Sequence, residues 1–515
     1  MFRFSQQKKR QVLDTAVNNQ SAPFEDMCLQ TLLGDNVKTI ASIFTDVDIV
    51  KFKYVDSHYD KAMKYCLVYS DGVVDTAIVN DNIIRALIQS PITASGKNLI
   101  DTLMNQVLQI SEIKKTDQMK EIAEAIASGD TVLLAEGQGQ ALVLNTKSFQ
   151  TRAISEPENE KVLSGPREGF TESLLLNLSL LRKRVMTPDL KMKFYTFGQR
   201  TQTKACICYF GELVNEKILK ELQKRLESID IDAVLDSNYI SELIKDSVVT
   251  PIRTMGFTEK PDTVIGKLLE GRIAILVDGT PKALTLPYLF VENFQSDEDY
   301  YLNYYYTSFT RIIRILGFLL TVSVPGLFIA IVAFHHEMMP TQLLISIATE
   351  RQSVPLPAAL EAFLMLIVFD ILREAGVRMP ANIGQALSIV GALVIGQAAV
   401  EAKLVAAPMI VVVGLTGITG LLVPKLSAPV IYIRFMLLLF SSVFGFFGFV
   451  TGASMVLIHV LNLRSFGIPL VMMSGDLQFQ ELKDSFIRAP WHQMLLRPKF
   501  SKDRQRMNNE KKKQT

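Results

Sequence analysis

The sequence predicts an α/β soluble N-terminal region of two subdomains, followed by an all-α polytopic membrane domain. Residues 315–334 form a run of twenty residues without a charge. At 1.5 Å per residue, such a helix matches the roughly 30 Å hydrocarbon core of a bilayer. Further long uncharged runs follow up to residue 463, whereas residues 1–300 carry mixed charges and alternate between strand-like and helix-like segments. Function therefore involves both a membrane domain and a soluble region.

Positive charge collects at the two ends of the chain, although the net charge of +2 is close to neutral. Residues 1–22 read as a disordered basic lead, and without an apolar run they predict no cleaved signal peptide. The tail at 464–515 holds eleven Lys and Arg against five Asp and Glu. Nucleic acid is one partner for such segments, but basic ends on the cytoplasmic face of an anionic membrane are the simpler interpretation. We therefore expect a lipid bilayer and no nucleic acid as a partner.

The sequence contains no pattern typical of an enzyme. Its four cysteines, at 28, 66, 206 and 208, have no spacing that indicates a disulfide framework or a zinc site. No Walker sequence, GxGxxG motif or paired histidine ligands occur. We therefore expect no catalytic residue, no metal and no cofactor.

The first soluble subdomain is expected at 23–151. Alternating apolar residues predict strands, helical periodicity predicts helices, and the GQG turn predicts a hairpin. The expected elements are strands at 48–55 and 65–69, helices at 97–113 and 117–127, and a hairpin of 131–135 with 140–145. A polar linker and a connecting helix follow at 152–187, in which Thr171 is a candidate N-cap and Arg182 to Arg184 form a basic C-terminal end.

The second soluble subdomain is expected at 188–300. Asn215 is a candidate cap, Pro261 starts a short helix, and Gly271 ends it. A turn at Asp278 and Gly279 is interpreted as a hairpin turn rather than as a phosphate-binding loop. The expected elements are a strand at 203–210, helices at 215–227, 241–245 and from 261, and a hairpin of 272–277 with 283–286.

The membrane domain is expected at 311–463, with about six spans. They are expected at 315–334, 355–373, 382–400, 404–424, 426–444 and 446–463. The last two are divided near Gly445 and Gly448, although one long tilted helix is an alternative. Basic residues before the first span, between the second and third, and in the tail predict that these places are cytoplasmic. An even number of spans follows, with both termini on the cytoplasmic side.

Polar residues at membrane depth are the candidates for pore or gating positions, because an unpaired acid there costs roughly 2.5 to 3.5 kcal/mol. Glu361 is either part of a water pathway or gate or a structural, hydrogen-bonded acid. Asp370 has Arg373 three residues on as a partner. In the third span the polar positions fall on one arc of the helix, which favours a pore or a polar subunit interface. These positions are Asn382, Gln385, Gln397 and Glu401.

Three long motifs resemble one known family. They are GPREGFTESLLLNLSLLRKR from Gly165, TEKPDTVIGKLLEGRIAILVDGTP from Thr258, and LPAALEAFLMLIVFDILREAGVRMPANIGQALSIVGALVIGQAAVEAKLV from Leu356. These segments resemble the A subunit of GerA-type spore germinant receptors, over about 166–469. The first 150 residues match less distinctively.

The resemblance implies a subunit in the spore inner membrane, so the cytoplasmic side on which the charge distribution places both termini is the spore core. It implies a permease-like B subunit and a lipoprotein C subunit as partners, nutrient sensing, and oligomerisation into a nutrient-gated ion channel. The helix from Gly165 is then a coupling element, with Arg167, Glu168 and Arg182 as its candidate residues. A related accessory spore-membrane channel or scaffold and a proton-coupled transporter are the alternatives, although no inverted repeat typical of carriers is found.

Overall fold

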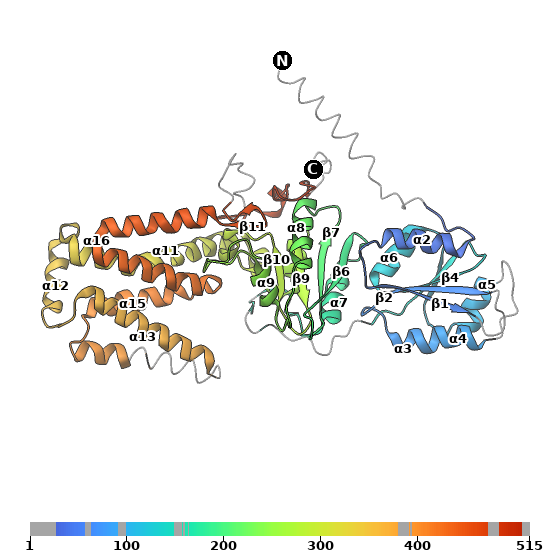
Figure 1. Ribbon diagram of the computed structural model, residues 1–515, viewed down its shortest axis with the longest axis horizontal. Helices are drawn as coiled ribbons and strands as arrows, with labels where there is room; N and C mark the ends of the chain where they lie inside the picture. Colours follow the sequence, from blue (N-terminus) through green and yellow to red (C-terminus); the bar gives the residue numbers. More distant parts are fainter. Residues whose placement is uncertain are drawn as a thin grey trace, which may run out of the picture.

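The computed structural model describes residues 27–56, 63–90, 99–148, 157, 160–162, 164–379, 391, 394–471 and 484–506. Two α/β subdomains and a helical domain lie end to end along the long axis of the molecule (Figure 1). The basic lead expected at the N-terminus and much of the linker expected before residue 165 lie outside the described residues.

The first subdomain is a five-stranded antiparallel sheet with helices on both faces. Its strand order is β1-β2-β4-β5-β3. The strands are β1 (Val50–Asp56), β2 (Lys64–Ser70), β3 (Ile113–Thr116), β4 (Thr131–Ala135) and β5 (Ala141–Leu144). One face packs on α2 (Leu33–Ile43) and α6 (Met119–Ser128). The other packs on a chain of short helical segments, which are α3 (Thr76–Ile78), η1 (Val79–Ile84), α4 (Arg85–Gln89), α5 (Leu99–Thr102) and η3 (Leu103–Val107).

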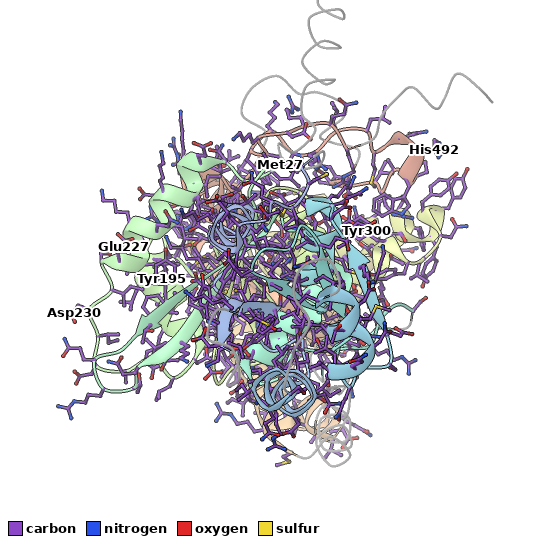
Figure 2. The ribbon with its side chains drawn as sticks, turned by 90° about the vertical axis from the view of Figure 1, so that its right-hand side faces the viewer. Met27, Tyr195, Glu227, Asp230, Tyr300 and His492 are labelled. Atoms are coloured by element: carbon purple, nitrogen blue, oxygen red, sulfur yellow. The ribbon has the colours of Figure 1, made fainter. Side chains whose placement is uncertain are left out.

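The second subdomain repeats this architecture. Its sheet order is β6-β7-β9-β10-β8, again antiparallel. The strands are β6 (Leu190–Phe197), β7 (Thr203–Phe210), β8 (Gly256–Thr258), β9 (Ile273–Val277) and β10 (Ala283–Leu286). The helices are α7 (Leu174–Arg184) and α10 (Pro261–Leu268) on one face, with α8 (Glu216–Glu227) and α9 (Ser237–Ile244) on the other. Seen along the long axis, Glu227 at the end of α8 and Asp230 lie on one side of the molecule, away from Tyr300 and His492 (Figure 2).

The two subdomains have the same topology. Numbered within each subdomain, both sheets follow the order one, two, four, five, three. In both, the helix before the fourth strand is followed by a glycine with positive φ, Gly129 (+95°) and Gly271 (+82°). Glycine adopts this left-handed conformation without the strain that a Cβ atom causes. The soluble region is therefore a structural duplication.

A single hydrophobic core joins the two subdomains. It contains the inner face of the first sheet, α6, α7 and the inner face of the second sheet, with Ile126, Leu181 and Cys206 among its fully buried members. The first subdomain also reaches β6 through the Asp48 N–H, which donates to the Met192 carbonyl at 2.9 Å. The helix predicted to connect the two units therefore packs against both.

Local sequence signals placed several elements correctly. The strand predicted at 203–210 is β7, and the Asn215 side chain accepts a hydrogen bond from Lys217 N–H at the start of α8. The predicted hairpin of 272–277 with 283–286 is β9 and β10.

Two local predictions were wrong. The helix predicted at 97–113 ends at Val107, because residues from Ile113 pair with β5 as strand β3. Thr171 does not cap the connecting helix, which begins at Leu174. Its Leu174 N–H donates to the Asp278 carboxylate at 3.0 Å instead, so the β9–β10 turn supplies the cap.

The helical domain follows two short helical turns, η4 (Phe290–Phe294) and η5 (Asp297–Tyr300). Its elements are α11 (Tyr304–Phe334), η6 (His336–Met338), α12 (Thr341–Arg351), α13 (Ala358–Arg378), helical residues 394–401, α15 (Ala407–Gly420), η7 (Pro424–Leu426) and α16 (Ser427–Asn462). The first helix thus starts at Tyr304, before the boundary predicted at 311, because Asn303 caps it by accepting from Tyr305 N–H.

The last helix is broken at Gly445, one of the two glycines at which the sequence predicts the break. Gly445 has φ +61° and ψ −138°, outside helical values. The two halves of α16 fold back beside one another (Figure 1), and a Cβ atom at Gly452 would lie 2.9 Å from Leu437. Among the described helices, α11 and the segment Pro424–Asn462 are long and apolar enough to cross a membrane. The six-span topology stays a prediction.

The basic tail is not a free extension over its described part. It contains β11 (Arg464–Ser465), β12 (Ile468–Pro469) and η8 (Trp491–Gln493). The Ser465 hydroxyl donates to the Thr254 carbonyl at 2.6 Å, and Lys502 N–H donates to the Leu213 carbonyl at 2.9 Å. The tail thus returns from α16 to the second subdomain.

Replacing Gly445 by alanine is expected to destabilise the helical domain. The added Cβ atom would lie 2.8 Å from Phe334, and the backbone conformation costs a non-glycine residue about 1–3 kcal/mol. Thermal unfolding of the full chain in detergent should show a lower unfolding temperature for Gly445→Ala. Gly414→Ala in α15 is the control, because a Cβ there meets no atom within 4 Å. Equal unfolding temperatures for the two variants would contradict the break at Gly445.

Candidate functional site

The candidate coupling residues lie around the C-terminal end of α7. Glu168 accepts from Lys183 Nζ and from Arg184 Nη2, both at 2.7 Å. Arg182 is buried and donates to the carbonyls of Thr187 (2.7 Å) and Leu190 (3.0 Å). Burial lowers the pKa of Arg182 to about 10. Its role here is to hold the connection from α7 to β6.

Arg167, at the start of this motif, is exposed. The basic end of α7 reaches towards the helical domain through Asp262 of α10. Arg184 lies 4.0 Å from the Asp262 carboxylate, to which the Tyr301 hydroxyl donates at 2.7 Å. Tyr301 also covers Gly165, where a Cβ atom would lie 2.6 Å from its ring. The motif residues therefore contact the segment that enters α11.

A buried arginine joins α11 to the soluble region and to the tail. Arg311 is fully buried, and its Nε donates to Asp299 at 2.7 Å. Its Nη1 donates to the Asp484 carbonyl (2.8 Å) and carboxylate (2.9 Å). Arg314, one turn on, donates to Asp299 at 3.0 Å. A buried charge requires partners of this kind, so the three segments are held together here.

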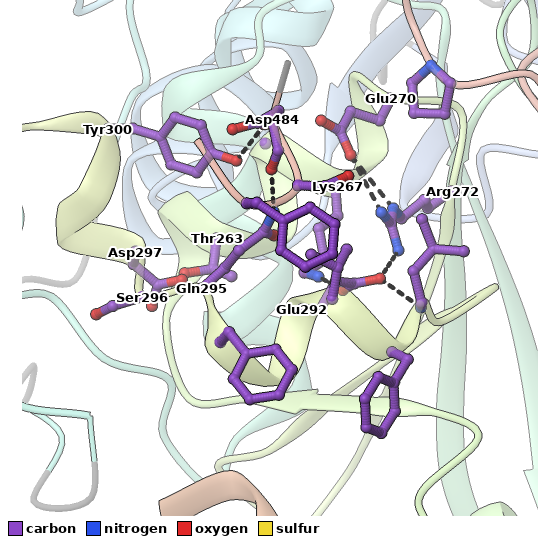
Figure 3. Close-up of a pocket in the computed structure, with 18 of the residues that line it drawn as sticks. Thr263, Lys267, Glu270, Arg272, Glu292, Gln295, Ser296, Asp297, Tyr300 and Asp484 are labelled. Atoms are coloured by element: carbon purple, nitrogen blue, oxygen red, sulfur yellow. Dashed lines mark hydrogen bonds and ion pairs between the residues drawn. The ribbon is translucent and has the colours of Figure 1, made fainter. Parts of the chain in front are cut away.

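A second set of charges lies beside this junction, on the wall of a cavity of about 860 Å³ (Figure 3). Arg272 is buried between Glu270 and Glu292, and Glu292 also pairs with Lys267. Arg506 of the tail donates to Glu270 at 3.1 Å. Burial lowers the pKa of Lys267, and the neighbouring positive charge of Arg272 lowers it further. Sequence reasoning missed this network, because its members come from distant segments.

Glu361 is paired within the chain. It lies in the first turn of α13, fully buried, 3.6 Å from Arg351 at the end of α12. Its carboxylate also accepts from the Ala406 N–H at 3.3 Å, just before α15. The geometry favours the structural interpretation of Glu361, as an acid that ties three helices together.

Asp370 has the partner that the sequence predicts and another that it does not. Arg373 lies 3.6 Å away on the same helix, as its spacing indicates. Arg434, buried on α16, forms a second ion pair with Asp370. This ion pair therefore connects α13 to α16.

The polar arc of the third predicted span is only partly described. Asn382 and Gln385 lie outside the described residues. Gln397 and Glu401 are both exposed, and Gln397 Nε2 donates to Glu401 at 2.9 Å. This Gln397–Glu401 face differs from the ion pairs of Glu361 and Asp370, because it points away from the chain.

Within the described ranges, no group of three or more His, Cys, Asp or Glu side chains is arranged to hold a metal ion. Cys206 and Cys208 point to one face of β7, as their spacing predicts, and both are buried in the core.

Glu168→Gln is expected to weaken the soluble region at neutral pH. Its hydrogen bonds with Lys183 and Arg184 lower the pKa of Glu168 in the folded chain. A carboxylate whose pKa is lower in the folded chain than in the unfolded chain stabilises the fold at pH values above the ordinary glutamate pKa. That stabilisation is lost as the pH falls through the lowered pKa of the folded chain. The difference in unfolding temperature between the wild type and the variant should therefore shrink on acidification. Exposed Glu124→Gln is the control, and a difference that does not change with pH would contradict the pairing.

Asp299→Asn is expected to destabilise the junction strongly. Removing one partner of a buried ion pair costs about 3–5 kcal/mol. The same change at Asp503, whose side chain is 54% exposed beside Arg497, should cost no more than about 1 kcal/mol. Thermal unfolding of the full chain measures both, and a similar small effect at the two positions would contradict the role of Asp299.

Comparisons with known proteins place the chain in one family. The family model for the Bacillus/Clostridium GerA spore germination protein matches residues 35–500. An uncharacterized membrane protein, YfkQ of Bacillus subtilis (strain 168), is 38% identical over 95% of this chain and 94% of its own length. Spore germination protein KA of the same organism is 40% identical over 82% of this chain and 78% of its own length.

A solved structure, the N-terminal domain of the A subunit of the Bacillus megaterium spore germinant receptor GerK3, is also similar. It is 30% identical to this chain, and the match covers 51% of this chain and 98% of the solved chain, with a TM-score of 0.42. The family match extends from the first subdomain to the tail. The chain therefore belongs to the GerA family of spore germination proteins.

Proposed function

We propose that the chain is the A subunit of a nutrient germinant receptor in the spore inner membrane, and that it oligomerises into a nutrient-gated ion channel. Membership of the GerA family supports the role in germination. The observation that carries the channel is the exposed Gln397–Glu401 face.

This face requires a polar environment if residues 382–400 cross the bilayer. Gln397 lies within this span and Glu401 directly follows it, so the carboxylate lies at the boundary of the hydrocarbon core. One hydrogen bond from Gln397 leaves most of the acceptor capacity of that carboxylate unused. Water or a second copy of the chain satisfies the remaining groups. An oligomer with the Gln397–Glu401 face at its centre supplies both water and a second copy of the chain.

The charged junction provides the coupling in this proposal. A nutrient bound by the permease-like B subunit, with the lipoprotein C subunit as the third component, favours one of two arrangements of the assembly. Such a shift requires that the nutrient binds the closed and the open arrangement of the assembly with different affinities. Arg311 and Tyr301 then transmit a displacement of the second subdomain to α11. With the six predicted spans, both termini of the chain lie on the spore-core side of the membrane.

Potassium release from spores tests the channel. We expect Gln397→Leu and Glu401→Gln to abolish nutrient-triggered release or to cause release without nutrient, at normal abundance of the chain. Glu361→Gln should instead lower the abundance, because Glu361 is bonded inside the domain.

Normal nutrient-triggered release from both Gln397→Leu and Glu401→Gln, with normal abundance, would contradict a pore or gate at this face. Saturable exchange of a solute by the purified chain in liposomes would favour the carrier instead. A matched control is Ile418→Leu on α15, since Ile418 is 69% exposed and apolar.

A further inference from the structure

A cavity and a neighbouring groove lie away from the Gln397–Glu401 face. The cavity, of about 860 Å³, lies between the second subdomain, α11, α16 and the tail, and the groove, of about 260 Å³, lies along α11 and α16. Both are lined by Phe290, Phe318, Leu319, Leu457 and Val460, so the groove adjoins the cavity. We treat the two together as one elongated space.

The two ends of this space differ in polarity. The cavity carries charged side chains of the second subdomain, such as Lys267 and Glu270 (Figure 3). The groove is lined by apolar side chains such as Val322 and Ile433, and Ser323 is the only polar one among its described lining residues. Hydrophobic groups favour the groove and ionic groups favour the cavity. This polarity fits an amphiphile better than a small soluble metabolite, which would leave the groove without an occupant.

The space opens sideways, towards the expected bilayer. Leu319, Leu457 and Leu461 line the cavity and are 52%, 59% and 45% exposed. Leu319 lies four residues into the uncharged run that starts at Ile315, about 6 Å along the helix. The opening therefore lies where the hydrocarbon core of the bilayer begins, and a lipid chain can enter without crossing water.

Two charged groups on the cavity wall form no direct ion pair within the described part of the chain. Most charged lining residues have such a partner, as Arg272 and Asp484 do. The Lys425 Nζ donates only to the Gln295 carbonyl, at 3.0 Å, and Asp297 lies two residues beyond Gln295. Glu160 lies within electrostatic range of both groups, and Lys267 within range of Asp297, but neither contacts them directly. One cation and one anion thus keep room for a direct contact with a ligand.

We propose that this space binds one glycerophospholipid of the surrounding bilayer that has a primary-amine headgroup. Its acyl chains occupy the groove between α11 and α16, its phosphate pairs with Lys425, and its ammonium group pairs with Asp297. Complementary charges of this kind give specificity as well as affinity. The inference rests on the membrane location in the proposed function and not on ion conduction.

Native mass spectrometry of the full chain tests this site. The chain is purified in mild detergent from membranes that contain phosphatidylethanolamine and phosphatidylglycerol. We expect one phosphatidylethanolamine per chain, and at least a fivefold lower bound fraction for Lys425→Gln. Ala453→Trp, which fills the groove, should have the same effect. Lys403→Gln is the control, because Lys403 is exposed and lies outside this space.

Charge reversal tests the headgroup separately. Asp297→Lys should repel the amine and shift the retained lipid towards phosphatidylglycerol. The proposal is overturned if the folded wild type retains no phospholipid, or if Lys425→Gln and Ala453→Trp retain as much as the wild type. Preferential retention of phosphatidylglycerol by the wild type overturns the assignment of Asp297. The unfolding temperature of each variant shows whether it is folded.

The outcome is distinct from that of the ion-release experiment. The bound lipid is measured on the purified chain, so a failure of ion conduction leaves the lipid result unchanged. Absence of the lipid contradicts only this site.

Discussion

A buried guanidinium at the start of α11 is the interaction on which the arrangement of the soluble and helical domains depends. Arg311 is bonded to Asp299 of the soluble region and to Asp484 of the tail, and a charge without partners at this depth would cost several kcal/mol. The three segments therefore stay docked or move together. Tyr301 extends this connection to Asp262 and so to the end of α7, which packs against both subdomains. In the proposed function, these contacts are the route by which a displacement of the soluble region reaches α11.

The cost of an unpaired buried charge also distinguishes two kinds of polar residue in the helical domain. Glu361 and Asp370 are neutralised inside the chain, by Arg351 and by Arg434, so they stabilise the packing of the helices. The Gln397–Glu401 face has only its internal hydrogen bond and points outwards. In a bilayer such a face favours contact with another copy of the chain or with water. This difference separates a structural role inside the subunit from a role in assembly or conduction.

Local signals in the sequence predicted much of the fold, because caps, turn glycines and alternating apolar residues act over a few positions. The start of α8 at Asn215 and the break at Gly445 are of this kind. Strand β8, with three residues, is too short for a pattern. The helix predicted at 97–113 is helical only up to Val107, because Ile113 pairs with β5 as the start of strand β3. The charged junction was not predictable, since Arg311 and Asp484 are 173 residues apart and only the fold brings them together. For the candidate site, the sequence indicated Glu361 and the polar arc but not their partners.

Disulfide cross-linking in native membranes tests most directly whether the Gln397–Glu401 face meets another copy of the chain. Gln397→Cys is compared with Ile418→Cys on the apolar surface of α15, both in a Cys28→Ser background, because Cys28 is exposed whereas the other three native cysteines are buried. The account predicts cross-linked dimers for Gln397→Cys and none for Ile418→Cys. Equal cross-linking of the two, or none at Gln397→Cys in a folded and abundant chain, would contradict an oligomer built around this face.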